Sequence, residues 1–218
     1  MSTTLISSTD ITTFHVSNPE KGQHGNLFWS ITNGKENKSH PRIQIANNKN
    51  PLKAPFGLTS FGETSGRQNL DISVDDAEIQ DFFAALDKWV TEHVWENVKE
   101  FFPKKAPASK EQLRDMYCPL LSQKDPSFDP LLRTKVNSSC LVFKIENGSH
   151  KGTLEDILPG SLVVPIVSVS KLWTMSGRFG CTLVSEAVMV WPKKPKSIDD
   201  IFFRSSDDVE NETVFQNV

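Results

Sequence analysis

The sequence predicts a mainly β protein with α-helices inserted near the middle of the chain. Two long apolar segments rich in β-branched residues, 162–173 and 179–191, flank a short turn that contains Gly177. This pattern is typical of a β-hairpin. Between about residues 75 and 121, apolar residues recur three and four positions apart, which is typical of amphipathic helices. With 218 residues the chain is long enough for one domain with a full core.

The turn end of this hairpin brings aromatic and basic side chains together. Trp173 lies just before the turn, and Arg178 and Phe179 come directly after it. Proteins hold unpaired nucleic acid by stacking bases on aromatic rings and by placing cations along the phosphates, and each stacked base contributes about 1–3 kcal/mol. The hairpin therefore predicts a site for single-stranded nucleic acid. Because side chains alternate along a strand, either aromatic can also be a core residue.

Aromatic and basic residues are interleaved in other predicted strands as well. From this pattern we expect base stacking on Phe56, Trp173 and Phe179. We expect phosphates to be neutralised by Lys53, Arg67, Lys135, Lys144, Lys171 and Arg178.

The formal net charge of −3 conceals a segregation of charge along the chain. Residues 1–70 carry seven basic and four acidic side chains, and residues 103–196 carry fourteen and eight. Residues 71–102 carry two basic and nine acidic side chains, and residues 197–218 carry one and six. A basic body interrupted by an acidic helix and followed by an acidic tail favours a polyanionic partner.

The clearest local prediction is a helix over about residues 76–101. Its apolar residues form one stripe, Asp75 can cap its first turn with Glu78 three residues later, and Pro103 ends it. A shorter helix is expected over 110–118 with Ser109 as its cap.

The remaining strands are expected to be short. One or two precede a hairpin turn at Asn33-Gly34, one lies at 42–45, and two flank a turn at 64–67. The segment 122–136 reads as an ordered loop that ends in a strand, and 140–145 reads as a further strand.

Other classes of protein are not favoured by the sequence. Its three cysteines are far apart and no histidine cluster accompanies them, so we expect free thiols, no bound metal and no cofactor. No catalytic motif is present, and we expect no enzymatic activity. Without a recognisable signal peptide or membrane span, we expect an intracellular protein that does not enter a membrane, located in the nucleus or cytoplasm of an infected cell if it is viral.

Residues 140–191 resemble the OB-fold single-stranded DNA-binding proteins of large DNA viruses and certain phages. The resemblance rests on a strand ending in SVSKLW, the basic turn TMSGRFG, a returning strand ending in VMVW, and the acidic segment beyond it. It implies an OB-like antiparallel β-barrel with a helical insertion, and we expect this domain over residues 1–196 with the insertion at about 75–121. The acidic tail at 197–218 contains too little apolar surface to fold alone, so we expect it to be flexible and disordered. The resemblance also implies sequence-tolerant binding of single-stranded DNA in replication, recombination or repair, and contacts between the tail and replication proteins. The neutral last residues, VFQNV, depart from that family pattern.

A second hypothesis remains open at this point. A viral structural or assembly protein with a β-sandwich fold would use the hairpin as a subunit contact and the tail for interaction. The sequence leaves the oligomeric state open, a homodimer included.

Overall fold

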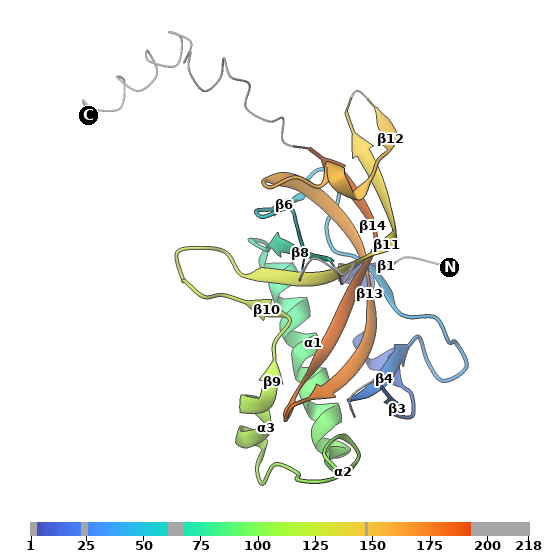
Figure 1. Cartoon of the computed structure of the whole chain (residues 1–218), viewed down its shortest axis with the longest axis vertical. Helices are drawn as coiled ribbons and strands as arrows, with labels where there is room; N and C mark the ends of the chain where they lie inside the picture. The colour runs from blue at the N-terminus through green and yellow to red at the C-terminus, as the bar shows by residue number, and fades with distance from the viewer. Residues whose placement is uncertain (1–3, 23–25, 61–67, 147, 193–218) are drawn as a thin grey trace, which may run out of the picture.

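The computed structural model describes residues 4–22, 26–60, 68–146 and 148–192. The chain is mainly β, with its three α-helices inserted between β8 and β11 (Figure 1). The strands are β1 (Thr4–Leu5), β2 (His15–Val16), β3 (Glu20–Lys21), β4 (Leu27–Thr32), β5 (Arg42–Gln44), β6 (Leu52–Ala54), β7 (Leu58–Ser60), β8 (Gln68–Ser73), β9 (Tyr117–Cys118), β10 (Leu121–Ser122), β11 (Leu131–Ile145), β12 (Ser149–Lys151), β13 (Ser161–Met175) and β14 (Arg178–Trp191). The helices are α1 (Ala77–Glu96), α2 (Val98–Phe101) and α3 (Lys110–Met116).

Five strands close into a ring, which confirms the predicted OB-like barrel. β6 pairs with β8, β8 with β11, β11 with β14, β14 with β13, and β13 returns to β6. Four of these pairings are antiparallel, and the pairing of β11 with β14 is parallel. The predicted alternative of a β-sandwich is wrong, because the sheet closes on itself instead of forming two packed layers.

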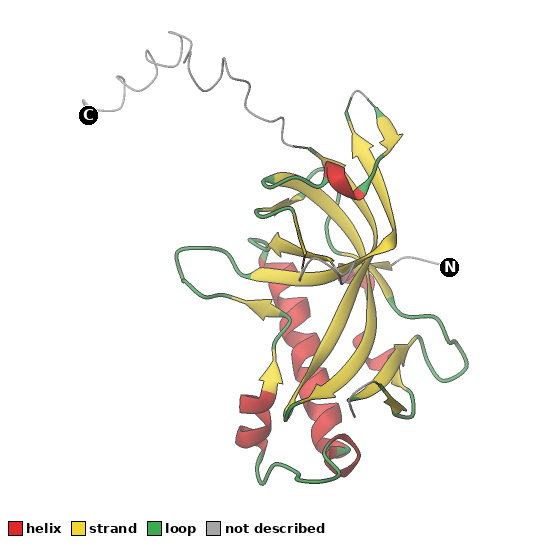
Figure 2. Ribbon diagram, viewed as in Figure 1, coloured by secondary structure: helices red, strands yellow, loops and turns green. Residues whose placement is uncertain are grey.

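The long hairpin is the central element of the fold and agrees with the sequence prediction. β13 and β14 run as two long curved strands through the molecule (Figure 2) and pair from Leu162–Trp191 at one end to Met175–Arg178 at the other. The two residues of the turn, Ser176 and Gly177, both have positive φ, 51° and 75°. These values belong to a type I′ turn, whose twist matches that of the paired strands.

The first strands extend the sheet beside this hairpin. β4 and β5 both pair with β13, and in the described part of the chain they pair there rather than with each other. The prediction of a hairpin at Asn33-Gly34 is therefore wrong, because the strands on either side of this turn do not pair with each other. Gly34 does adopt the positive φ of a turn, 86°. β11 is longer than predicted, because its ladder with β14 continues across Asn137–Cys140 through a shift in register.

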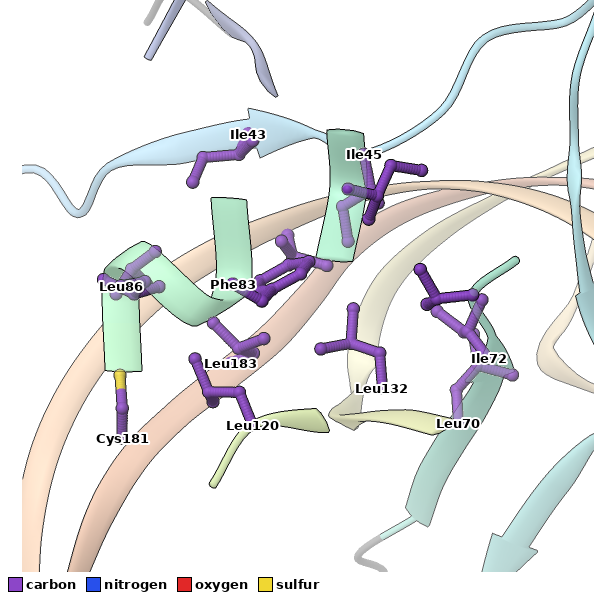
Figure 3. Packing of buried hydrophobic residues seen from close by; sticks show 14 of the residues in the cluster. Ile43, Ile45, Leu70, Ile72, Phe83, Leu86, Leu120, Leu132, Cys181 and Leu183 are labelled. Atoms are coloured by element: carbon purple, nitrogen blue, oxygen red, sulfur yellow. The ribbon is translucent and has the colours of Figure 1, made fainter. Parts of the chain in front are cut away.

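The helical insertion packs its apolar stripe into the barrel core. Phe83 and Leu86 of α1 lie among side chains of β8, β11 and β14, such as Leu70, Leu132 and Leu183 (Figure 3). The N-cap is Asp76 and not the predicted Asp75; its carboxylate accepts the backbone N–H groups of residues 78 and 79.

The long helix is also shorter than predicted. It ends at Asn97, whose side chain donates to the carbonyl oxygen of His93 at 2.9 Å, and α2 begins as a separate turn. α3 starts as predicted, with the Ser109 hydroxyl accepting the N–H of Gln112. The predicted turn at 64–67, the domain boundary at 196 and the acidic tail lie outside the described residues.

Candidate nucleic-acid interface

The outer face of β4, β13, β14, β11 and β8 is the surface on which the candidate residues gather. Side chains alternate along these strands, and the inward set joins the core together with α1. On β13, Leu172 and Thr174 are buried, whereas Lys171, Trp173 and Met175 point to the other side. The helices therefore occupy the inner side of this sheet, and the outer side carries polar, basic and aromatic groups.

A row of two aromatic side chains and one glycine crosses three of these strands. Trp173 is the register partner of Phe28 on β4 and of Gly180 on β14. The indole covers Gly180, since a Cβ atom at that glycine would lie 2.8 Å from Cζ2 of Trp173. The Lys171 ammonium lies 4.7 Å from the centre of the Phe28 ring, which is a cation–π contact. The row thus presents a half-buried indole beside a positive charge.

Basic side chains of β11 continue the outer face. Arg133 and Lys135 point outward from β11, between the inward residues of the same strand. Arg133 donates through Nε and Nη2 to the two carboxylate oxygens of Asp71, at 2.7 and 2.8 Å. This bidentate pair raises the pKa of Arg133 and fixes the direction of the guanidinium. Lys135 faces its register partner Asn69 on β8.

A hollow of about 410 Å³ joins the aromatic row to these basic residues. Its lining includes Phe28 and Trp173 on one side and Arg133 and Lys135 on the other. Among the described residues that line it, none has an acidic side chain. A flat apolar ring, a cation and an open hollow in one place are what a nucleotide base and its phosphate require.

One wall of the hollow is the chain between β9 and β10, and α1 holds it in place. The Tyr117 hydroxyl donates to Asp87 at 2.5 Å, and the N–H of Leu120 points at both carboxylate oxygens of Asp87 at 3.3 Å. Burial raises the pKa of Asp87 to about 6, although these hydrogen bonds act in the opposite direction. Tyr117 is buried, and Leu120 itself lines the hollow.

Four of the sequence-predicted residues lie on this outer face. Lys135 and Trp173 line the hollow, and Lys171 lies beside it above Phe28. Arg178 is exposed and starts β14 opposite Met175, at the end of the same face.

The prediction for Phe179 is wrong. Its side chain is 1% exposed and contacts the rings of Phe102 and Tyr117, with centroids 6.0 and 5.1 Å away. Phe179 follows Arg178 and precedes Gly180, both outward positions, so alternation turns it into the core. A residue buried in this way cannot stack on a base.

Three other predicted residues are not brought to the hollow. The Lys144 ammonium is paired with Glu146 at 2.9 Å and Asp156 at 3.4 Å, so its charge is already balanced. Lys53 is exposed on β6, where it faces Ser73 and Leu162 on another wall of the barrel. Phe56, 53% exposed, lies in the turn after β6, and Arg67 lies outside the described residues.

Among the lining residues that sequence reasoning missed are Phe28, Asn69 and Arg133, whose side chains offer a ring, an amide and a cation. The alternation Arg133-Thr134-Lys135-Val136 carried a usable signal, because two cations two positions apart point to the same face of a strand. Phe28 directly precedes Trp29, and both Trp29 and Ile31 are fully buried. Alternation along the strand therefore turns Phe28 to the outer face.

Two further findings concern the part of the chain that the structure describes. Within the described ranges, no cluster of three or more His, Cys, Asp or Glu side chains could hold a metal ion. None of the described helices is long and apolar enough to cross a membrane.

Comparison with known proteins finds likeness in structure only. No protein-family profile matches the chain, and no curated protein matches its sequence. The single-stranded DNA-binding protein from bacteriophage Enc34 superposes with a TM-score of 0.40 and 11% identity, over 90% of this chain and 99% of that protein. The same phage protein in complex with single-stranded DNA gives a TM-score of 0.40 and 9% identity, over 82% and 97% of the two chains. Its C-terminal truncation gives 0.39 and 10%, over 82% and 96%.

Proposed function

We propose that this protein binds single-stranded DNA on the outer face of β4, β13, β14, β11 and β8. The observation that carries the proposal is the row of Phe28, Trp173 and Gly180 next to the cations Lys171 and Lys135. The ring offers a stacking surface that every base can use, and the cations follow the phosphates without reading sequence. Binding of this kind tolerates any sequence.

The geometry also favours a single strand over a duplex. The hollow of about 410 Å³ is lined by side chains that can contact an unpaired base on its flat face. A duplex keeps its bases stacked on one another, so Trp173 would have no base face to cover.

We further propose that the protein acts where single strands are exposed, in replication, recombination or repair. The support is chemical: a binder that uses stacking and phosphate contacts alone protects any sequence equally. The acidic segment after Trp191 is an additional candidate contact for replication proteins.

The test is the fluorescence anisotropy of a labelled oligothymidylate titrated with the full chain at low and moderate salt. We expect sub-micromolar, salt-sensitive binding that duplex DNA does not compete away and that Trp173→Ala weakens. A matching oligouridylate in the same assay measures the preference between DNA and RNA. No binding at low salt would reject the proposal, and an assembly protein would then become the leading hypothesis. Equal competition by duplex DNA would reject the single-strand preference.

A further inference from the structure

The outer face continues beyond the hollow at Trp173 toward the other end of the hairpin. There, Phe143 of β11, Ile166 of β13 and Ala187 and Met189 of β14 line a second hollow of about 270 Å³. Phe143 is the register partner of Met189, and Ile166 is the partner of Ala187. An aromatic side chain that is 40% exposed thus stands over an apolar depression.

The hydrophobic core is filled at this level without the side chain of Phe143. Val142, Val188 and Val190 supply the inward side chains at this level, and all three are buried. The neighbouring outward residue Leu141 is even more exposed than Phe143, at 58%. Exposed apolar groups that gather around a depression are typical of a binding surface rather than of a packed core.

Register shifts keep both hollows on one face. β13 and β14 shift in register between Ile166 and Val167, and β11 and β14 shift between Val136 and Leu141. A bulge exchanges the inward and outward positions of a strand. On β14 the inward residues are Phe179, Cys181, Leu183 and Ser185 before the shift and Val188 and Val190 after it. The outward series therefore runs from Gly180 to Met189.

A polar stretch lies between the two ends. Its hollow of about 770 Å³ includes Ser168 and Ser170 and shares Phe143, Ile166 and Ala187 with the apolar depression. The one acidic residue in its lining, Glu186, is paired with Arg42. The path between Trp173 and Phe143 is therefore lined by groups that tolerate a phosphate backbone.

The far end repeats the arrangement found at the near end. Lys151 on β12 is the register partner of Phe143, so its exposed side chain lies on the same face as the ring. At the near end, Lys171 lies two positions before Trp173 on β13, and its ammonium lies over the Phe28 ring. An aromatic ring with a neighbouring cation matches the base and the phosphate of one nucleotide. The cation therefore favours a nucleotide over a purely apolar partner at this position.

We propose that Phe143 is a second base-stacking position for the same DNA strand that stacks on Trp173. This proposal rests on the proposed function and extends it to a footprint along β14. Met189 lies nine positions after Gly180, which corresponds to a contour of about 30 Å at about 3.3 Å per residue. An OB-fold binds about 4–16 nucleotides, so one strand can reach both rings.

The experiment compares oligothymidylates of about four and about twelve nucleotides on the full chain and its variants. We expect Phe143→Ala to weaken binding of the long oligonucleotide by roughly 5- to 100-fold and to leave the short one unchanged, because a short strand occupies only the stronger end. Trp173→Ala is expected to weaken both. Lys151→Glu should follow Phe143→Ala, with a smaller loss that fades at high salt.

Phe128 supplies the matched control. It is 71% exposed in the loop between β10 and β11, beside Asp125 and Asp129, and Phe128→Ala should leave both affinities unchanged. Thermal unfolding of each variant checks that the barrel is intact.

The outcomes separate the two proposals. If the parent protein binds the long oligonucleotide but Phe143→Ala binds it equally well, the second position is rejected and the proposed function stands. The depression would then face a protein, and sedimentation of the parent and of Phe143→Ala would show whether a second copy covers it. Equal losses on both oligonucleotides also reject the second position. If the parent binds neither oligonucleotide, the proposed function itself fails.

Discussion

Trp173 and Phe179 show how one position of alternation separates a binding residue from a core residue. Both are large aromatics close to the same type I′ turn, Trp173 on the strand before it and Phe179 on the strand after it. Trp173 lies on the outer face over Gly180, whereas Phe179 packs on Tyr117 inside. The two residues should therefore respond to substitution in opposite ways.

The first prediction compares Trp173→Ala with Phe179→Ala. The loss of the indole should weaken binding of single-stranded DNA by roughly 5- to 100-fold with little effect on unfolding. The loss of the buried phenyl ring should lower the free energy of unfolding by about 3–5 kcal/mol. Urea unfolding and anisotropy, measured on both variants, check this. A large stability loss in Trp173→Ala with unchanged binding would contradict the assignment.

The second prediction concerns the support beneath the indole. Gly180→Ala introduces a Cβ at 2.8 Å from Trp173 Cζ2, so the ring must move away from the strand. We expect weaker DNA binding, because the stacking surface is displaced. In a Trp173→Ala background the same substitution should have no further effect on affinity. If it still weakens binding there, the effect passes through the neighbouring Cys118 carbonyl oxygen at 3.2 Å and not through the ring.

At the scale of elements, the segment from β9 to β10 depends on a single carboxylate of α1. Asp87 accepts from Tyr117 and Leu120 and so fixes a wall of the hollow to the helix. The pKa of Asp87 is raised to about 6 from its ordinary 3.8. In the unfolded chain this carboxyl ionises near pH 4, whereas the folded protein retains the proton up to about pH 6. This group therefore lowers stability as the pH rises from about 4 to 6, and its contribution is constant outside that window.

The third prediction is that Asp87→Asn removes this pH dependence. The amide oxygen still accepts from Tyr117 and Leu120, but it has no charge to bury. Relative to the variant, the parent should lose at most about 3 kcal/mol of unfolding free energy between pH 4 and pH 6. Urea unfolding at several pH values measures the difference. Stability curves that stay parallel across this range would show that Asp87 titrates normally.

The sequence predicts elements better than it predicts their partners. The stripe of α1 and the turn at Ser176-Gly177 follow from local chemistry, and both are confirmed. The interruption at Asn97 depends on one side-chain hydrogen bond to His93, which no periodicity reveals. Which residues of a long strand point outward changes at each bulge, such as the register shift after Ile166. Bulges arise from pairing with another strand, so the sequence of one strand does not reveal them. The inward position of Phe179 follows from plain alternation once Gly180 is paired with Trp173, and the sequence does not reveal that pairing.

In the molecule as a whole, acidic and basic side chains gather on different sides of the sheet. The exposed start of α1 carries Asp75, Asp76, Glu78 and Asp81. The outer face on the other side carries Arg133, Lys135, Lys171 and Arg178. The segregation of charge was visible in the sequence, but the closure that places these groups on opposite sides was not. It requires the parallel pairing of β11 with β14, between residues about fifty positions apart.

The last prediction tests whether this distribution guides binding. The logarithm of the association constant should fall linearly with the logarithm of salt concentration, with a slope of roughly −2 if Lys135, Lys171 and Arg178 each neutralise one phosphate, since Arg133 is already paired with Asp71. Arg178→Glu should weaken binding and make the slope less negative, because one phosphate contact becomes a repulsion. Lys88→Glu makes the same charge change on the exposed side of α1, where Lys88 pairs with Glu92. It should leave the slope unchanged, since α1 lies behind the sheet. Titrations of both variants across a salt series decide the matter: equal losses would mean that the strand senses only the net charge of the protein and that the outer face is not its path.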